Sequence, residues 1–113
     1  MTSSRIVLEF EGKNLKELLY HIKKEYGFGQ KVEEKDFSVF THTKYFKRIN
    51  MEVAGVIVFH EYEPNKCRIS VWGAGGVGGW LRLTDWGTED SIRDEIVKDI
   101  SDYAEQYLKL KKC

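Results

Sequence analysis

The 113-residue sequence is 42% hydrophobic and 13% aromatic, which excludes a disordered chain and fits a single domain over residues 1–113. Its 18 basic and 18 acidic side chains cancel, and this balance disfavours nucleic acid as a partner because nucleic-acid binders usually carry a basic excess. The sequence contains no apolar run of roughly 18 residues and no secretory signal, so we expect a soluble protein with no membrane partner.

Residues 4–10 alternate between apolar and polar side chains, which predicts a strand with one buried face. Residues 15–26 carry one apolar stripe at helical spacing and predict a helix. We expect Asn14 and Glu17 to form a capping box at its start, and Gly27 to end it in a left-handed conformation.

Residues 28–35 mix glycine with charge and read as a connection. Residues 37–42 and 44–50 predict two strands, with a bend or tight hairpin at Thr41-His42-Thr43. Residues 51–62 are apolar on both faces at the middle, which indicates a central strand.

The segment Glu63-Pro64-Asn65-Lys66 predicts a type I turn because proline stands at its second position. Residues 67–72 then form the returning strand, and residues 80–84 a further short one. Thr88 is expected to cap a final amphipathic helix of roughly twenty residues.

This element order predicts an α+β fold, a two-layer sandwich of the form strand, helix, four to five antiparallel strands, helix. Both helices are expected on one face of a curved sheet. The order is similar to that of the TATA-binding-protein-like and helix-grip folds, and this similarity concerns the fold alone.

Five of the ten glycines lie between residues 73 and 79, and the three tryptophans lie in or beside the same stretch. The residues 73–78 match G-x-G-x-x-G, but a strand and not a helix follows, so no dinucleotide cofactor is expected. The stretch is a flexible hairpin, a bulged strand pair, or a flap whose amides and tryptophans close over a ligand.

Trp72 and Trp80 alternate with the aliphatic residues of their strands, so they face away from the helices if the aliphatics face them. With Phe46 or Tyr45 they would form an aromatic patch on an open sheet face. The expected ligand- or partner-binding residues are Phe46, Arg48, Trp72, Gly73, Gly75, Gly76, Gly78 and Trp80.

Residues 44–48 read Lys-Tyr-Phe-Lys-Arg, which is typical of an edge strand protected by charge. The same segment, with Arg68 and Arg82, would bind single-stranded nucleic acid if these cations converged on one surface.

The three histidines lack the spacing of a metal site, although His42 and His60 could meet across neighbouring strands. Cys67 and Cys113 are spaced neither as a disulfide framework nor as metal ligands, and free thiols indicate the cytoplasm. No nucleophile, base and acid stand at catalytic spacing. We therefore expect no metal, no cofactor and no catalytic residue.

The pattern Lys44-Tyr45-Phe46-x-Arg48, the apolar strand at 53–58, Gly75-Gly76 and Asp85-Trp86-Gly87 resembles a family of small uncharacterised prokaryotic proteins. The resemblance covers roughly the C-terminal two-thirds of the chain. It implies a stand-alone domain in a prokaryote and brings no activity or catalytic residue with it.

Together these patterns favour a non-enzymatic domain that binds a protein partner or its own copy, as a homodimer, through the open sheet face and the Gly/Trp-rich loop. One alternative is a small molecule held in a helix-grip-like cleft under residues 73–79. The other is nucleic acid bound along residues 44–48.

Overall fold

The structure is a computed structural model that describes residues 4–29, 31–46, 51–77 and 88–113. The side chains at positions 46, 51, 75–77, 88 and 89 lie outside this description. In chain order the elements are β1 (Ile6–Glu11), α1 (Leu15–Tyr26), β2 (Lys31–Glu33), β3 (Phe37–Phe46), β4 (Met51–Glu63), β5 (Lys66–Val77), α2 (Thr88–Asp102), a π-helical turn (Tyr103–Tyr107) and β6 (Lys111–Lys112).

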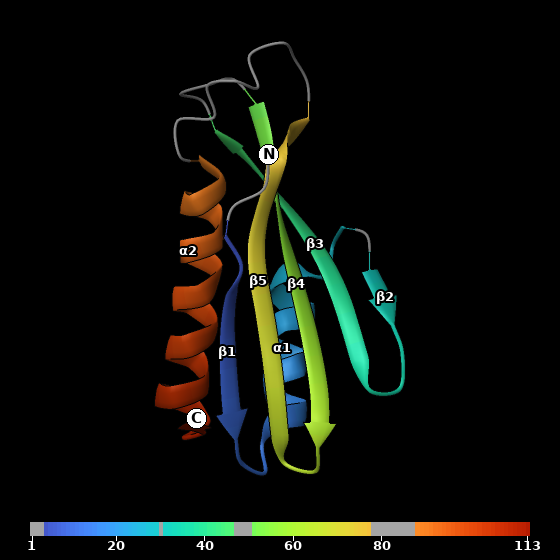
Figure 1. Ribbon diagram of the computed structural model, residues 1–113, viewed down its shortest axis with the longest axis vertical. Helices are drawn as coiled ribbons and strands as arrows, with labels where there is room; N and C mark the ends of the chain where they lie inside the picture. Colours follow the sequence, from blue (N-terminus) through green and yellow to red (C-terminus); the bar gives the residue numbers. More distant parts are fainter. Residues whose placement is uncertain (1–3, 30, 47–50, 78–87) are drawn as a thin grey trace.

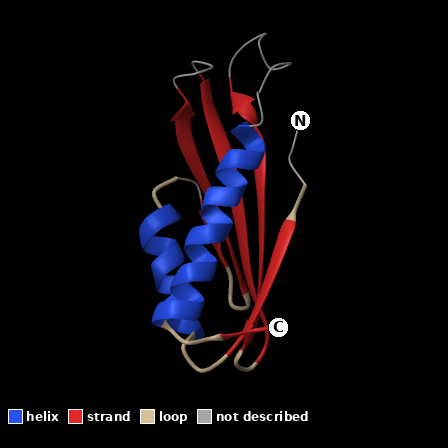
Figure 2. Cartoon of the chain, turned by 90° about the vertical axis from the view of Figure 1, so that its left-hand side faces the viewer, coloured by secondary structure: helices blue, strands red, loops and turns tan. Residues whose placement is uncertain are grey.

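The strands form one antiparallel sheet in the order β2-β3-β4-β5-β1-β6 (Figure 1). Both helices lie on the same side of this sheet, as Figure 2 shows from the side. The predicted two-layer α+β architecture is therefore confirmed. Its consequence is that neither of the described helices lies over the other face of the sheet.

The core fills the space between the helices and the inner face of the sheet. Successive strand side chains point to opposite faces, so every second residue of β1, β3, β4 and β5 enters the core. Its fully buried members include Phe10, Phe40, Val53, Ile57, Ile69 and Val71 from the sheet, and Leu18, Ile22, Ile92, Ile96 and Ile100 from the helices.

Helix α2 packs closely over a glycine of the sheet. Gly55 of β4 pairs with Gly73 of β5, and both are buried on the helix side. A Cβ atom at Gly55 would lie 2.6 Å from Cδ1 of Ile96. Gly55 therefore sets how near α2 can pack to β4.

The predicted bounds of α1 are confirmed, but the predicted details of its ends are wrong. The Asn14 side chain makes no cap bond; its Nδ2 donates to the carbonyl oxygen of Leu108 at 3.3 Å. Gly27 has φ −89°, which is not left-handed. A Cβ there would lie 2.2 Å from the carbonyl oxygen of Lys23, so the absence of a side chain is what this position requires.

Residues 37–46 form one strand, so the predicted bend at Thr41-His42-Thr43 is wrong. Phe37 pairs with His60, and the pairing with β4 continues residue by residue to Phe46 opposite Met51. The continuous ladder keeps the backbone extended through the polar residues, because tertiary pairing outweighs local composition.

Three further differences concern the connections. The predicted link 28–35 contains β2, and β6 was not predicted. Asn65 has φ +65°, whereas the third residue of a type I turn has negative φ; asparagine tolerates this conformation. The predicted strand 80–84 and the Asp85-Trp86-Gly87 segment lie outside the described residues.

Candidate functional site: the open face of the sheet

The uncovered face of the sheet carries an apolar row across five strands. Pairing registers place one residue from each of β2, β3, β4, β5 and β1 side by side on this face: Val32, Val39, Val58, Ser70 and Val7. Val32 is 52% exposed and Val7 41%. The solvent-exposed face of an antiparallel sheet usually carries polar residues. A row of valines on this face is therefore unusual, and it indicates a surface that another molecule covers.

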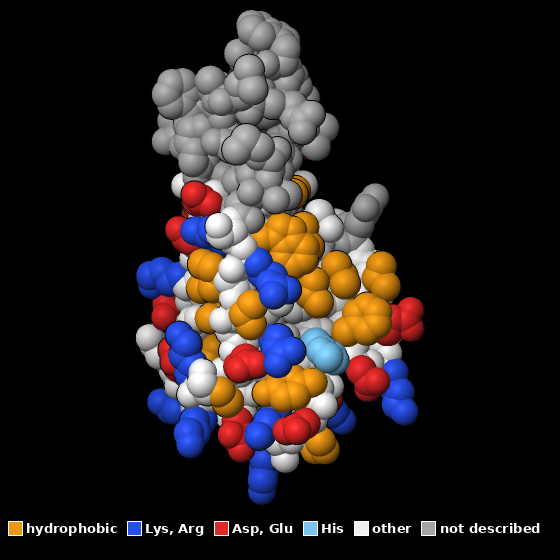
Figure 3. All heavy atoms as spheres, in the orientation of Figure 1, with side chains coloured by type: hydrophobic (Ala, Val, Ile, Leu, Met, Phe, Trp, Pro, Cys, Tyr) orange, Lys and Arg blue, Asp and Glu red, His pale blue; other side chains and the backbone are white. Residues whose placement is uncertain are grey.

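The next row toward the β3–β4 end continues this apolar surface. This row consists of Thr41, Val56 and Trp72. The row beyond it consists of Thr43, Ala54 and Ala74. Phe37 lies on the other side of the valine row and is 40% exposed. We call Val7, Val32, Phe37, Val39, Val56, Val58 and Trp72 the apolar face. Figure 3 shows hydrophobic side chains over the middle of this side of the molecule, with Lys or Arg and His side chains among them.

Trp72 stands above small neighbours. Ser70 and Ala74 precede and follow it on the same face of β5, and Ser70 is only 7% exposed although it points away from the helices. The larger side chains around Ser70 therefore shield it. This part of the face therefore has a large ring beside small side chains.

A charged group borders the apolar face at the β4–β5 turn. Arg68 Nε donates to Glu9 Oε1 at 2.9 Å, and its guanidinium lies 4.8 Å from the centre of the Tyr62 ring. The rings of His60 and Tyr62 are 6.2 Å apart. Arg68 and Glu9 thus neutralise each other within the chain.

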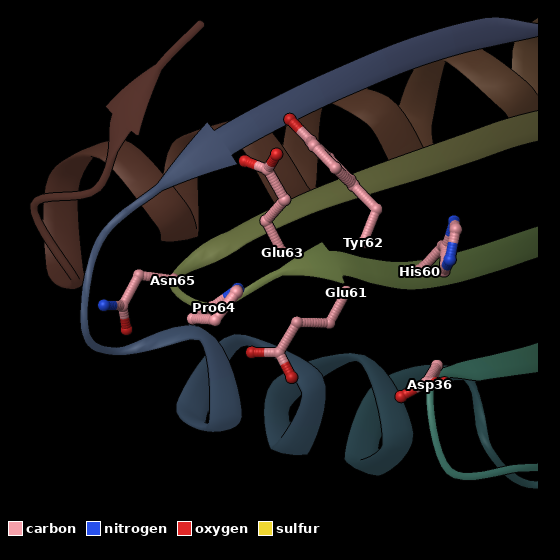
Figure 4. A pocket seen from close by; sticks show the side chains of 7 residues that line it. All are labelled: Asp36, His60, Glu61, Tyr62, Glu63, Pro64 and Asn65. Atoms are coloured by element: carbon pink, nitrogen blue, oxygen red, sulfur yellow. The ribbon is translucent and has the colours of Figure 1, made fainter.

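A hollow of about 490 Å³ lies beside this border, at the turn. Figure 4 shows that its side chains diverge: Glu61 points toward α1, and Tyr62 and Glu63 toward β1. A ligand site needs polar groups that converge on one point, and this arrangement does not supply them.

The predicted binding residues fall into three groups. Trp72 lies on the apolar face, and Gly73 lies opposite it, on the helix side. Gly75 and Gly76 belong to β5, where the register with β4 shifts between Glu52 and Ala54; a bulged strand pair was one of the predicted forms. The Phe46 side chain, Arg48, Gly78 and Trp80 lie outside the described part.

Tyr45 takes the place on this face that was predicted for Phe46 or Tyr45. It pairs with Glu52 at the end of the face and is 51% exposed. The valines of β2 and β3 were not predicted as site residues. Val32 was missed because a three-residue strand between charged neighbours is too short to show a period.

A polar cluster joins the two helices on the other side of the sheet. Asp99 Oδ2 accepts a 2.7 Å hydrogen bond from the Tyr26 hydroxyl and lies 3.1 Å from His21 Nε2. The His21 ring stacks on Tyr103 at 3.8 Å. Burial raises the pKa of the Tyr26 hydroxyl far above its usual range, the Asp99 contact adding to it, so Tyr26 stays a donor. These groups fix α1 against α2.

The histidines do not meet as a metal pair. His42 pairs with Gly55 and faces the helices, whereas His60 is on the open face. Burial lowers the pKa of His42. Within the described ranges, no group of three or more His, Cys, Asp or Glu side chains could hold a metal ion.

The two described cations of the nucleic-acid hypothesis lie on opposite faces. Lys44 Nζ bonds both carboxylate oxygens of Glu95 on α2, at 2.7 and 2.8 Å, while Arg68 pairs with Glu9 on the open face. The remaining cations of that hypothesis, Lys47, Arg48 and Arg82, lie outside the described residues.

The two thiols differ in environment. Cys67 is in the core, where burial raises the pKa of its thiol to about 12 and so keeps it protonated. Cys113 is exposed beside β1, its backbone N–H donating to Glu9 O at 2.9 Å.

Comparison of the chain with protein-family models, curated proteins and solved structures gives no match. The resemblance to the small prokaryotic family and to the TATA-binding-protein-like and helix-grip orders stays a prediction. Of the helices in the described part, none is long and apolar enough to cross a membrane.

Proposed function

We propose that this protein is a non-enzymatic binding module that uses the apolar face of its sheet to bind a protein surface. The observation that supports it is the valine row, with Trp72 and Phe37 on either side, on the face away from both described helices. Covering such side chains contributes roughly 25 cal/mol per Å² of apolar area removed from water.

The chemistry of the face favours a protein partner over the two alternatives. A small-molecule site is concave with convergent polar groups, whereas the hollow of about 490 Å³ on this face is lined by Lys31, Val32, Val39 and Thr41 and offers few polar groups. A nucleic-acid surface gathers cations, and Lys44 and Arg68 point to opposite sides. Large aromatic side chains such as Trp72 are typical anchors of protein interfaces.

The same considerations support a non-enzymatic role in the cytoplasm. Among the described residues, the acid–base set of His21, Tyr26 and Asp99 is engaged in holding two helices together. Cys67 and Cys113 are free thiols, which suits a reducing compartment.

A photo-crosslinking residue in place of Val39, on the apolar face, tests the proposal in cells. We expect covalent adducts from Val39 and none from the matched control at Tyr20, which is 68% exposed on α1. Adding Trp72→Lys should remove the Val39 adducts, because a charge in a desolvated interface is strongly unfavourable. Absence of adducts at Val39, or equal adducts at both positions, would contradict the proposal.

A further inference from the structure

We propose that the surface covering the apolar face is the same face of a second copy of this chain. This inference rests on the proposed function and names its partner. Two sheets would then pack face to face in a four-layer α–β–β–α dimer, with the strands of the copies crossing at about 30° as in aligned sandwiches.

The size of the face fits a dimer interface. The registers place five strands side by side in the valine row and three or four strands in the other rows, and the pairs from Phe37–His60 to Tyr45–Glu52 span five residues on this face of β3. At the usual spacings of a sheet, such a face covers roughly 600 Å². Two copies would then bury roughly 1,200 Å² in total, which is the lower end of the range for specific interfaces.

The apolar face is suited in shape to pack against the same face of a second copy. A twofold interface presents the same patch from both sides, so each protrusion needs a recess on its own surface. Trp72 is the large ring, and the small residues Ser70, Ala54 and Ala74 lie around it. The ring of one copy can pack over the small side chains of the other, while the valine rows interdigitate between them.

The charges also permit self-association. The chain has a formal net charge of zero, so two copies do not repel each other through their net charge. Arg68 and Glu9 satisfy each other within one chain and require no opposite charge from the partner. A partner of other chemistry would have to offer a neutral apolar surface of this same extent.

Sedimentation velocity of the purified chain, from about one to several hundred micromolar, tests the inference. We expect a dimer, and we expect Trp72→Lys to weaken it by at least about 100-fold, the scale of losing an interface anchor. Val56→Lys repeats the test at the neighbouring strand, and circular dichroism checks that each variant folds. Tyr20→Lys, on the helix side, should leave the dimer unchanged.

Cysteine crosslinking locates the interface. Val58 lies on β4, the middle strand of the face, so it should stand near the twofold axis. In a Cys113→Ser background, Val58→Cys should form a disulfide-linked dimer under mild oxidation, and Tyr20→Cys should not. The disulfide must form at concentrations where the parent chain sediments as a dimer.

The outcomes separate the inference from the proposed function. A monomer at several hundred micromolar, together with face-specific adducts to another protein in cells, overturns the homodimer and leaves the binding module standing. A monomer without such adducts overturns both. A dimer that survives both lysine variants and does not crosslink through Val58→Cys uses another surface, and this also overturns the inference.

Discussion

At the residue scale, a single carboxylate oxygen, Asp99 Oδ2, connects helix α2 to helix α1. It accepts a hydrogen bond from the Tyr26 hydroxyl and contacts His21, which lies five residues earlier on α1. The edge of the Tyr26 ring in turn meets His42 on β3, with ring centres 5.1 Å apart. His42 therefore lies where α1 packs on the sheet.

Because burial lowers the pKa of His42, the folded protein resists its protonation more than the unfolded chain does. As pH falls below about 6.5, the usual histidine value, the unfolded state takes up a proton first and gains stability. Nearby Glu95 opposes this shift and Lys44 adds to it, and burial prevails.

We expect His42→Gln to lose less stability than the wild type between pH 7.5 and 5.5. Urea unfolding at both pH values measures the difference. His21 also contacts a carboxylate, so the comparison is made between variant and wild type, which share that group. Equal losses in the two proteins would show that His42 contributes nothing to the pH dependence.

At the scale of elements, the bounds of a helix or strand were predicted best where one of its faces is apolar. The stripe from Leu15 to Tyr26 located α1 to the residue, because burial on one side is a periodic signal. The bend at Thr41–Thr43 was wrong, and β2 and β6 were missed, because pairing with distant strands determines those segments. The residues within such a segment do not show which distant strand it will pair with.

The contact of α2 with β4 gives a prediction at this scale. Gly55→Val should destabilise the fold by about 1–3 kcal/mol, the usual effect of overpacking, because the new side chain would collide with Ile96. The neighbouring Ala54→Val points to the open face and should change stability by no more than about 0.5 kcal/mol.

Chemical denaturation in a Trp72→Lys background measures both changes without a contribution from association. If Ala54→Val proved as harmful as Gly55→Val, the cause would be the strand itself and not its distance from α2.

At the scale of the whole molecule, one tryptophan of the candidate site was placed from the sequence and the valine surface was not. The alternation around Trp72 was enough to assign it to the face opposite the aliphatic residues of its strand. The valine row needs the registers of four strand pairs, which a single sequence does not contain. Gly75 and Gly76 are located in β5 only by its pairing with β4, whose register shifts between Glu52 and Ala54, and the sequence does not show this shift.

Association through the apolar face links stability to concentration. The melting temperature of the wild type should rise between about 5 and 200 micromolar protein, because mass action favours the folded dimer. Trp72→Lys should melt at one temperature throughout this range. Differential scanning calorimetry provides the measurement, and a concentration-independent wild type would argue against a folded dimer.

The position of β1 has a consequence for synthesis on the ribosome. Its neighbours in the sheet are β5, whose paired residues come about sixty residues later in the chain, and β6, which follows near the end of the sequence. Protein synthesis proceeds at roughly 5–20 residues per second, so β1 is without its neighbouring strand β5 for several seconds, and β5 does not yet cover Leu8 and Phe10. Glu9 and Glu11 alternate with these side chains, and such interleaved charges discourage a nascent strand from joining a strand of another chain.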